Sequence, residues 1–170
     1  MTYVDELLAT AEKLLQDTTL DPPTRSDCNR AVSTAYYACF HHICSLVADR
    51  IAGLTDGTEL GQKEWTEVFR SITHASIIQA LIELKKERRD EIGNNELTLK
   101  VFKKLHTARE DADYNALKTF DVLEAKQLIR EARDLCGLAF DDAFELKDAR
   151  GDLTFFIRRL FSIKPKAVTK

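Results

Sequence analysis

The sequence predicts an all-α protein: an antiparallel helical bundle of about five main helices, with a short C-terminal amphipathic helix after it. Two observations predict this fold class, and the chain length indicates a single domain. The 170 residues include only 3 prolines and 6 glycines, which is too few for the many turns of a β fold. Apolar residues recur every three or four positions along most of the chain. A chain of this length hides roughly 70% of its unfolded surface, which is enough for one domain with a real core.

The first two helices are predicted on either side of a proline break. An apolar stripe predicts a helix over residues 2–16, and Pro22 and Pro23 cannot continue it. Thr24 or Ser26 can then cap a long helix over residues 25–52. The core face expected for this long helix comprises Val32, Ala35, Tyr36, Cys39, Ile43, Leu46 and Val47.

The rest of the chain follows the same pattern. Residues 53–64 are expected to be a polar connector, and a short helix over 65–72 leads into a longer one that Gly93 stops. Asn94 or Asn95 can cap a helix whose stripe is Leu97, Val101, Leu105, Ala108 and Ala112. Residues 121–146 show the clearest helical period, and a shorter stripe runs from Leu153 to Phe161. We therefore expect a bundle over residues 1–148 and a basic, amphipathic extension over 149–170.

Composition excludes several classes of function. A formal net charge of −3 is not that of a generally basic nucleic-acid coat, although it allows a local basic site. The N-terminal stretch lacks the basic region of a signal peptide, and no apolar run reaches the roughly 20 residues that span a bilayer. The four cysteines form no CxxC pair and Cys39 falls on an apolar helix face, which predicts reduced core thiols in a cytoplasmic protein. Without a spanning run, no membrane partner is predicted. His41 and His42 point about 100° apart, so no metal site and no cofactor are predicted.

Two groups of polar residues are candidates for a site. One is the side of the helix over 25–52 that faces away from its core face: Arg30, Ser33, Thr34, Tyr37 and His41. The other is the segment from Arg109 to Tyr114. Arg109 lies about 40° from Leu105 on a helix, at the rim of the buried face, where a fixed guanidinium can bind phosphate or carboxylate. The alternative is structural: Arg109 and Asp113 are four residues apart and form an ordinary helical ion pair.

Three segments together resemble the HEPN superfamily (higher eukaryotes and prokaryotes nucleotide-binding). RAVSTAYYACFHHI is similar to its R-x-YYA-x-FH helix. The segments WTEVFRSITH and LHTAREDADYN are similar to the W-x-x-V-[YF]-R and R-x-x-A-D-Y motifs of one uncharacterised bacterial branch. The resemblance covers roughly residues 3–145.

The resemblance implies a dimeric all-α bundle whose motif helices face a cleft at the dimer interface. Many HEPN domains are metal-independent endoribonucleases with an Arg-x4–6-His motif, in which two protomers place Arg and His over the scissile phosphate and the ribose 2′-OH attacks. Arg stabilises the developing negative charge and His transfers a proton. In this sequence Tyr114 stands where that motif has His, so His41 or His106 would have to supply an imidazole.

Two functions are therefore expected as alternatives. In the first, the chain binds RNA or a nucleotide in a toxin–antitoxin, phage-defence or RNA-processing system, as a homodimer. Its binding residues are Arg30, Tyr37, His41, Arg109 and Asp113, and if it is a ribonuclease its catalytic residues are Arg109, Tyr114 and His41. In the second, it is a non-catalytic interaction module that pairs with a nucleotidyltransferase antitoxin or another partner protein. A helical scaffold without a ligand is a third option.

The extension over residues 149–170 lies outside the resemblance. It carries six positive charges and one acidic residue, Asp152. We expect its Phe-rich face to pack on the bundle or on a dimer partner, with contact to nucleic acid or a membrane surface as the alternatives.

Overall fold

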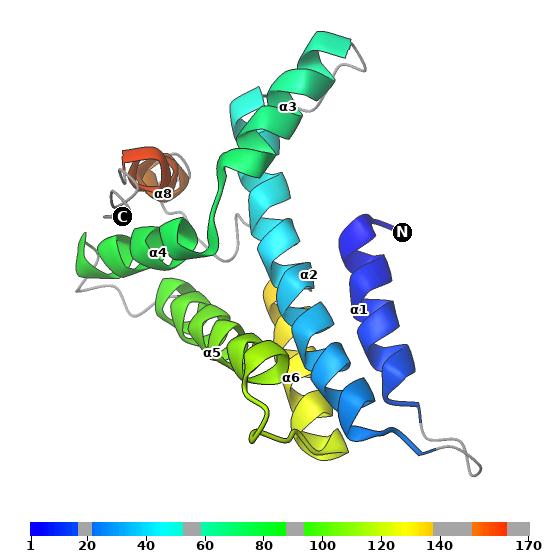
Figure 1. Cartoon of the computed structure of the whole chain (residues 1–170). Coiled ribbons are helices and arrows are strands. Elements are labelled where there is room, and N and C mark those ends of the chain that lie inside the picture. Colours follow the sequence, from blue (N-terminus) through cyan, green and yellow to red (C-terminus); the bar gives the residue numbers. More distant parts are fainter. Residues whose placement is uncertain (17–21, 53–58, 88–93, 138–150, 163–170) are drawn as a thin grey trace, which may run out of the picture. The chain divides into compact units, whose positions relative to one another are not determined.

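The computed structural model describes residues 1–16, 22–52, 59–87, 94–137 and 151–162, and all regular elements within these ranges are helices (Figure 1). They are α1 (Tyr3–Leu14), α2 (Arg25–Ala52), α3 (Glu59–Ser71), α4 (His74–Glu87), α5 (Asn94–Tyr114), α6 (Val122–Gly137) and α8 (Gly151–Ser162). The prediction of an all-α fold is confirmed. Of the helices in the described ranges, none has the length and apolar character needed to cross a membrane.

Capping boxes start the first two helices. In α1 the Thr2 hydroxyl accepts a hydrogen bond from the Asp5 backbone N–H at 3.2 Å, and the Asp5 carboxylate accepts one from the Thr2 N–H at 2.8 Å. Thr24 and Asp27 repeat this arrangement ahead of α2, so Thr24 rather than Ser26 is the cap. Hydrogen bonds from the threonines lower the pKa of both aspartates.

The helices form two compact units, which we describe separately. Unit 1 comprises Met1–Ile43 and Lys100–Ala139, and unit 2 comprises Cys44–Leu99 and Phe140–Lys170. The long helix α2 and the helix α5 each contribute to both units. The boundary expected near residue 148 lies outside the described residues.

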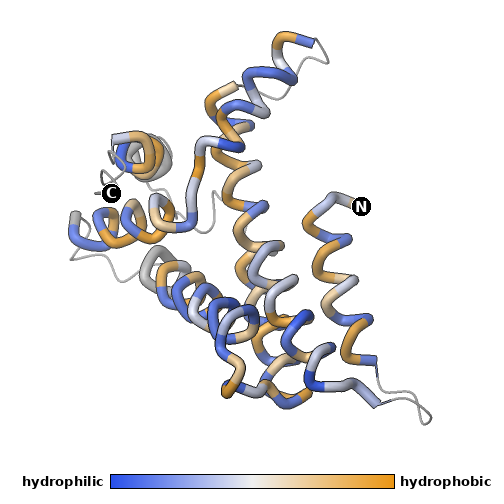
Figure 2. The backbone as a smooth tube through the Cα atoms, viewed as in Figure 1, coloured by the Kyte–Doolittle hydropathy of each residue, from blue (hydrophilic) through white to orange (hydrophobic). Residues whose placement is uncertain are grey.

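Unit 1 contains α1, the first part of α2, most of α5, and α6. Its buried apolar residues come from all four helices and include Leu8, Ala11, Val32, Ala35, Tyr36, Cys39, Phe102, Leu105, Leu128, Ile129 and Ala132. In Figure 2 apolar residues recur along these helices instead of forming one block, as expected for helices with one buried face.

Contacts within unit 1 show that neighbouring helices run antiparallel. Tyr3 at the start of α1 meets His41 far along α2, with ring centroids 5.3 Å apart. Between α2 and α5, the Asn29 side-chain amide donates to the Ala112 carbonyl at 3.1 Å, near the start of α2 and the end of α5. Further along, the ring of Tyr36 lies 5.6 Å from that of Phe102. These pairings bring the first half of α2 against the second half of α5.

Unit 2 contains the C-terminal helix. Here α8 packs on α4, and Phe156 and Leu160 of α8 are buried. This packing confirms the expectation that the Phe-rich face of the extension covers other helices. Elsewhere in unit 2, the indole N–H of Trp65 on α3 donates to the Asp49 carboxylate of α2 at 2.7 Å.

Several expectations from sequence were wrong in detail. Residues 59–64 form the first turns of α3 rather than a connector, because one internal Gly61 costs only about 1 kcal/mol among strong helix formers. Ser33 is buried, since α1, α5 and α6 surround this part of α2. Leu46, Val101 and Ala112 are only half-buried. The expected stop at Gly93, the helical residues 138–146 and the side chain of Leu153 lie outside the described residues.

Candidate functional site

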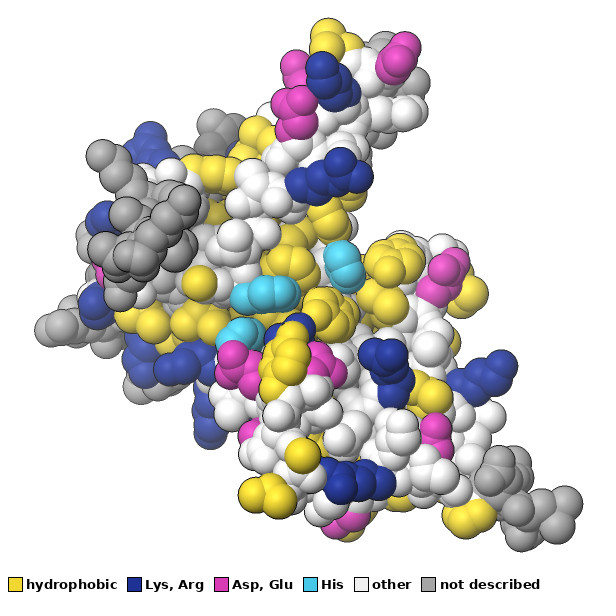
Figure 3. All heavy atoms as spheres, in the orientation of Figure 1, with side chains coloured by type: hydrophobic (Ala, Val, Ile, Leu, Met, Phe, Trp, Pro, Cys, Tyr) yellow, Lys and Arg dark blue, Asp and Glu magenta, His cyan; other side chains and the backbone are white. Residues whose placement is uncertain are grey.

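A cluster around Arg109 joins α2 to the end of α5 within unit 1. The guanidinium Nε of Arg109 lies 2.8 Å from the Asp113 carboxylate, one turn later on α5. Its Nη2 donates to the Tyr37 hydroxyl of α2 at 2.6 Å and approaches the Tyr114 hydroxyl at 3.3 Å. We call Tyr37, Arg109, Asp113 and Tyr114 the arginine cluster. In Figure 3 dark blue, magenta and yellow side chains adjoin one another over the end of α5, where this cluster lies.

Two aromatic rings flank the guanidinium of Arg109. Its central carbon lies 5.3 Å from the centroid of the Tyr37 ring and 5.1 Å from that of Tyr114, within the range of cation–π attraction. The Arg109 side chain is only 14% exposed, whereas Tyr114 is 74% exposed. Tyr114 is thus the outer wall of the cluster and Tyr37 the inner one.

The arginine cluster keeps Arg109 charged and leaves one of its amino groups available. Burial opposes the charge, but the hydrogen bond to Tyr37 and the Asp113 carboxylate outweigh it and raise the pKa of Arg109. Nη2 donates to both tyrosines and Nε forms the ion pair with Asp113 without hydrogen-bond geometry, while Nη1 makes no hydrogen bond to the part of the chain that the structure describes. A guanidinium held on two sides with one donor group unused can bind a phosphate or carboxylate oxygen.

His41 lies beside the cluster, next to Tyr37. Its ring centroid is 6.3 Å from that of Tyr37, one turn earlier on α2, and 5.3 Å from that of Tyr3 on α1. Burial lowers the pKa of His41, which favours the neutral imidazole at pH 7, the form that accepts a proton. His106, the other imidazole considered for this role, packs edge-on against the Tyr36 ring at 5.5 Å.

Arg30 is placed on an open groove beside the cluster. The groove has a volume of about 490 Å³ and lies between the start of α2 and the end of α5, with Asp113 and Tyr114 in its wall. The exposed side chain of Arg30 forms no ion pair or hydrogen bond with the described residues. The structure therefore brings Tyr37, Arg109, Asp113 and Tyr114 into contact, with Arg30 and His41 on either side.

Two residues that line the groove beside the arginine cluster were not among the site residues predicted from the sequence. Arg25 donates hydrogen bonds to the backbone carbonyls of Ala116 and Lys118, the second at 3.0 Å, and so fixes the chain that follows α5. Asn29 donates to the end of α5 and also lines the groove. Their spacing could have indicated them, because the polar residues Arg25, Asn29 and Ser33 recur every four residues and so share one side of α2.

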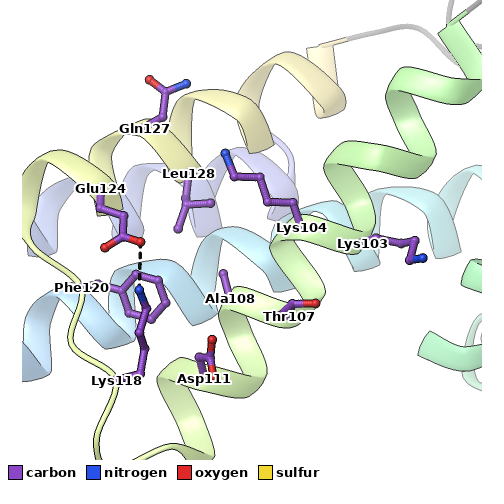
Figure 4. A pocket seen from close by; sticks show the side chains of 10 residues that line it. All are labelled: Lys103, Lys104, Thr107, Ala108, Asp111, Lys118, Phe120, Glu124, Gln127 and Leu128. Carbon is purple, nitrogen blue, oxygen red and sulfur yellow. Dashed lines mark hydrogen bonds and ion pairs between the residues drawn. The ribbon is translucent and has the colours of Figure 1, made fainter.

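A second groove of about 490 Å³ lies between α5, α6 and the connection that joins them (Figure 4). Its charges largely compensate one another. Lys118 pairs with Glu124 at 3.2 Å and lies over the ring of Phe120, while Lys104 pairs with Glu131 at 2.7 Å. Lys103 points away from the Lys118–Glu124 pair in Figure 4. With Lys104 and Lys118 already paired, this groove is a weaker anion site than the arginine cluster.

No group of three or more His, Cys, Asp or Glu side chains with metal-binding geometry occurs in the described ranges. The chain matches none of the family models, curated proteins or solved structures with which it was compared.

Proposed function

We propose that this protein binds RNA or a nucleotide phosphate through the arginine cluster, as a member of the HEPN superfamily that its motifs resemble. The observation that carries the proposal is the geometry of Arg109. Asp113 and Tyr37 fix its guanidinium at 2.8 and 2.6 Å, both tyrosine rings flank it, and its Nη1 is unused by the described residues. Such preorganisation lowers the entropic cost of binding a phosphate.

The groove beside the cluster extends the proposed site. Arg30 supplies a second cation on the same opening as Tyr114. The exposed ring of Tyr114 can stack on a nucleobase, and stacking of this kind contributes about 1–3 kcal/mol per base. Single-stranded RNA, with phosphates and unstacked bases, supplies both kinds of contact.

A ribonuclease reaction is the catalytic form of this proposal. Arg109 would stabilise the phosphate in the transition state, Asp113 would orient Arg109, and His41 or Tyr114 would move the proton. The neutral form of His41 suits a general base, and the Tyr114 hydroxyl lies 3.3 Å from Arg109 Nη2. As in the family it resembles, two copies of the chain would face each other across the cleft, in a toxin–antitoxin, phage-defence or RNA-processing setting.

Replacing Arg109 by alanine is expected to weaken binding of a fluorescein-labelled single-stranded RNA about 10- to 100-fold, the equivalent of roughly 1.4–2.8 kcal/mol. Fluorescence anisotropy at fixed salt measures the effect. Arg130→Ala is the matched control, because it removes the same side chain from an exposed position on α6 in the same unit. Equal losses in both variants, or no binding by the wild type, would reject the proposed site.

The same samples test for cleavage. Wild-type protein incubated with a mixed RNA pool and a chelator is expected to produce fragments, and Arg109→Ala is not. If the wild type leaves the RNA intact, or if the variant cleaves it equally well, the ribonuclease form is rejected while binding is judged separately by anisotropy.

Replacing Asp113 by asparagine is expected to change RNA affinity in the opposite direction. The amide keeps the size and an oxygen of the side chain beside Arg109 Nε, but it removes a negative charge, 22% exposed, that competes with phosphate. Affinity should rise about two- to fivefold, in line with the roughly 0.2–1 kcal/mol of a partly exposed ion pair. Weaker binding by this variant would show that the carboxylate itself contacts the ligand or that the fixed ion pair is essential.

An interaction module that pairs with a nucleotidyltransferase or another protein is the second candidate. It is favoured by the apolar side chains exposed around the connection after α5, namely Tyr114, Leu117 and Leu123. Protein interfaces are enriched in such aromatic and apolar residues. Co-purification with a small nucleotidyltransferase encoded beside this chain, lost on Leu117→Ser, would favour this reading over a solitary RNA-binding protein.

A further inference from the structure

Two cysteines of unit 1 meet between α2 and α6. The sulfur atoms of Cys39 and Cys136 are 3.7 Å apart, although the residues are separated by 97 positions in the sequence. The Cys39 sulfur also lies 3.5 Å from the Ala132 carbonyl oxygen, one turn before Cys136 on α6. All four cysteines are free thiols in the structure. The other two, Cys28 and Cys44, are both buried on α2.

The two thiols have different access to solvent. Cys39 is fully buried, and burial raises the pKa of its thiol well above the ordinary value, so it does not ionise at neutral pH. Cys136 is only half-buried and lies in the last turn of α6. A small oxidant can therefore reach Cys136, whereas the Cys39 sulfur is shielded from solvent.

We propose that Cys136 and Cys39 form a peroxide-sensitive pair that closes to a reversible intramolecular disulfide linking α6 to α2. A disulfide needs an S–S distance of about 2.05 Å, so the sulfur atoms must approach by roughly 1.7 Å for the bond to form. Neither sequence spacing nor a CxxC motif marks this pair. It is brought together only by the packing of α6 on α2, and it does not depend on the proposed function.

The chemistry balances with hydrogen peroxide as the oxidant. The Cys136 thiolate attacks one peroxide oxygen, the O–O bond breaks, and hydroxide leaves with the thiol proton as water, which gives a sulfenic acid on Cys136. The Cys39 sulfur then attacks the Cys136 sulfur. The S–O bond breaks, and the hydroxyl leaves as a second water with the Cys39 proton. Two thiols and one peroxide become one disulfide and two water molecules.

The disulfide would form on the same helix, α2, that carries Tyr37 of the arginine cluster, but on another side of that helix. Tyr37 and His41 each lie two residues from Cys39 on α2, about 200° around the helix axis, and so face the opposite side. Oxidation would thus link α2 covalently to α6, on the side of α2 opposite to Tyr37 and His41.

The test uses the full-length, reduced protein treated with hydrogen peroxide under native conditions. After quenching, denaturation and alkylation, mass spectrometry is expected to find two alkylated cysteines in place of four. A proteolytic peptide pair joined through Cys39 and Cys136 is also expected, with dithiothreitol restoring all four thiols. Cys136→Ser should abolish the disulfide, whereas Cys28→Ser, the matched control on α2, should still form it.

Other results would overturn the proposal. These are four free thiols after peroxide treatment, a sulfinic acid that accumulates on Cys136 without pairing, or a disulfide that joins two chains or uses Cys28 or Cys44. The thermal midpoint provides a second readout on the wild type. A cross-link across 97 residues restricts the unfolded chain and should raise the Tm of the oxidised protein. A lower Tm would refute the inference that the bond fits the native packing of α2 on α6.

Discussion

Phe102→Ala is expected to lower the free energy of unfolding by about 3–5 kcal/mol, the usual cost of removing a buried phenylalanine ring. Phe102 is fully buried in unit 1, and its ring lies 5.6 Å from that of Tyr36, which is also fully buried. Truncation would leave a cavity against this ring. Tyr36 in turn contacts the rings of Tyr37 and His106, so the loss extends toward the arginine cluster. Urea denaturation followed by circular dichroism measures the change.

Lys103→Ala is the matched control for Phe102→Ala. Lys103 is the next residue on α5 and is exposed, so its truncation should change the free energy of unfolding by less than about 0.5 kcal/mol. If Phe102→Ala cost as little as this control, the packing of α5 on α2 in unit 1 would be wrong.

Phe156→Ala is expected to cost a similar amount, about 3–5 kcal/mol, although Phe156 belongs to the C-terminal segment that lies outside the family resemblance. The reason is its burial: Phe156 is fully inaccessible, on the helix α8 that packs on α4. A loose, dispensable extension would tolerate this substitution. Urea denaturation measures the free energy, and limited proteolysis shows whether α8 becomes accessible.

Phe161→Ala provides the comparison on the same helix. Its side chain is 47% exposed, so much less apolar surface returns to water on truncation and the cost should be under half that of Phe156→Ala. Equal and small effects at both positions would mean that α8 does not contribute to the stability of unit 2.

The fold could be predicted largely from local chemistry. Pro22 and Pro23 separate α1 from α2, and the threonines of the two capping boxes mark where these helices begin. The heptad-like stripes of α1 and α6 each have one apolar side, which is why periodicity identified them. The start of α3 was missed because a single Gly61 was read as part of a loop, although the residues around it favour a helix.

The contacts within one helix of the candidate site could be predicted from the sequence, but the contacts between helices could not. The Arg109–Asp113 ion pair follows from a spacing of four on one helix, and the structure confirms it at 2.8 Å. The hydrogen bond from Arg109 to Tyr37 does not, because the two residues are 72 positions apart and meet only when α5 packs on α2. The sequence placed Ser33 with Tyr37 on the side of the helix that faces away from the core, but Ser33 is buried whereas Tyr37 is half-buried.

The division into two compact units also separates the chromophores of the protein. All four tyrosines, namely Tyr3, Tyr36, Tyr37 and Tyr114, belong to unit 1, and the single tryptophan, Trp65, belongs to unit 2. Trp65 emission, excited at wavelengths that tyrosine does not absorb, therefore reports on the surroundings of the indole in unit 2, while the four phenols report on unit 1. A ligand that draws Arg109 away from the Tyr37 and Tyr114 rings would alter the tyrosine spectrum directly. The wild-type chain thus carries its own pair of optical reporters, one for each unit.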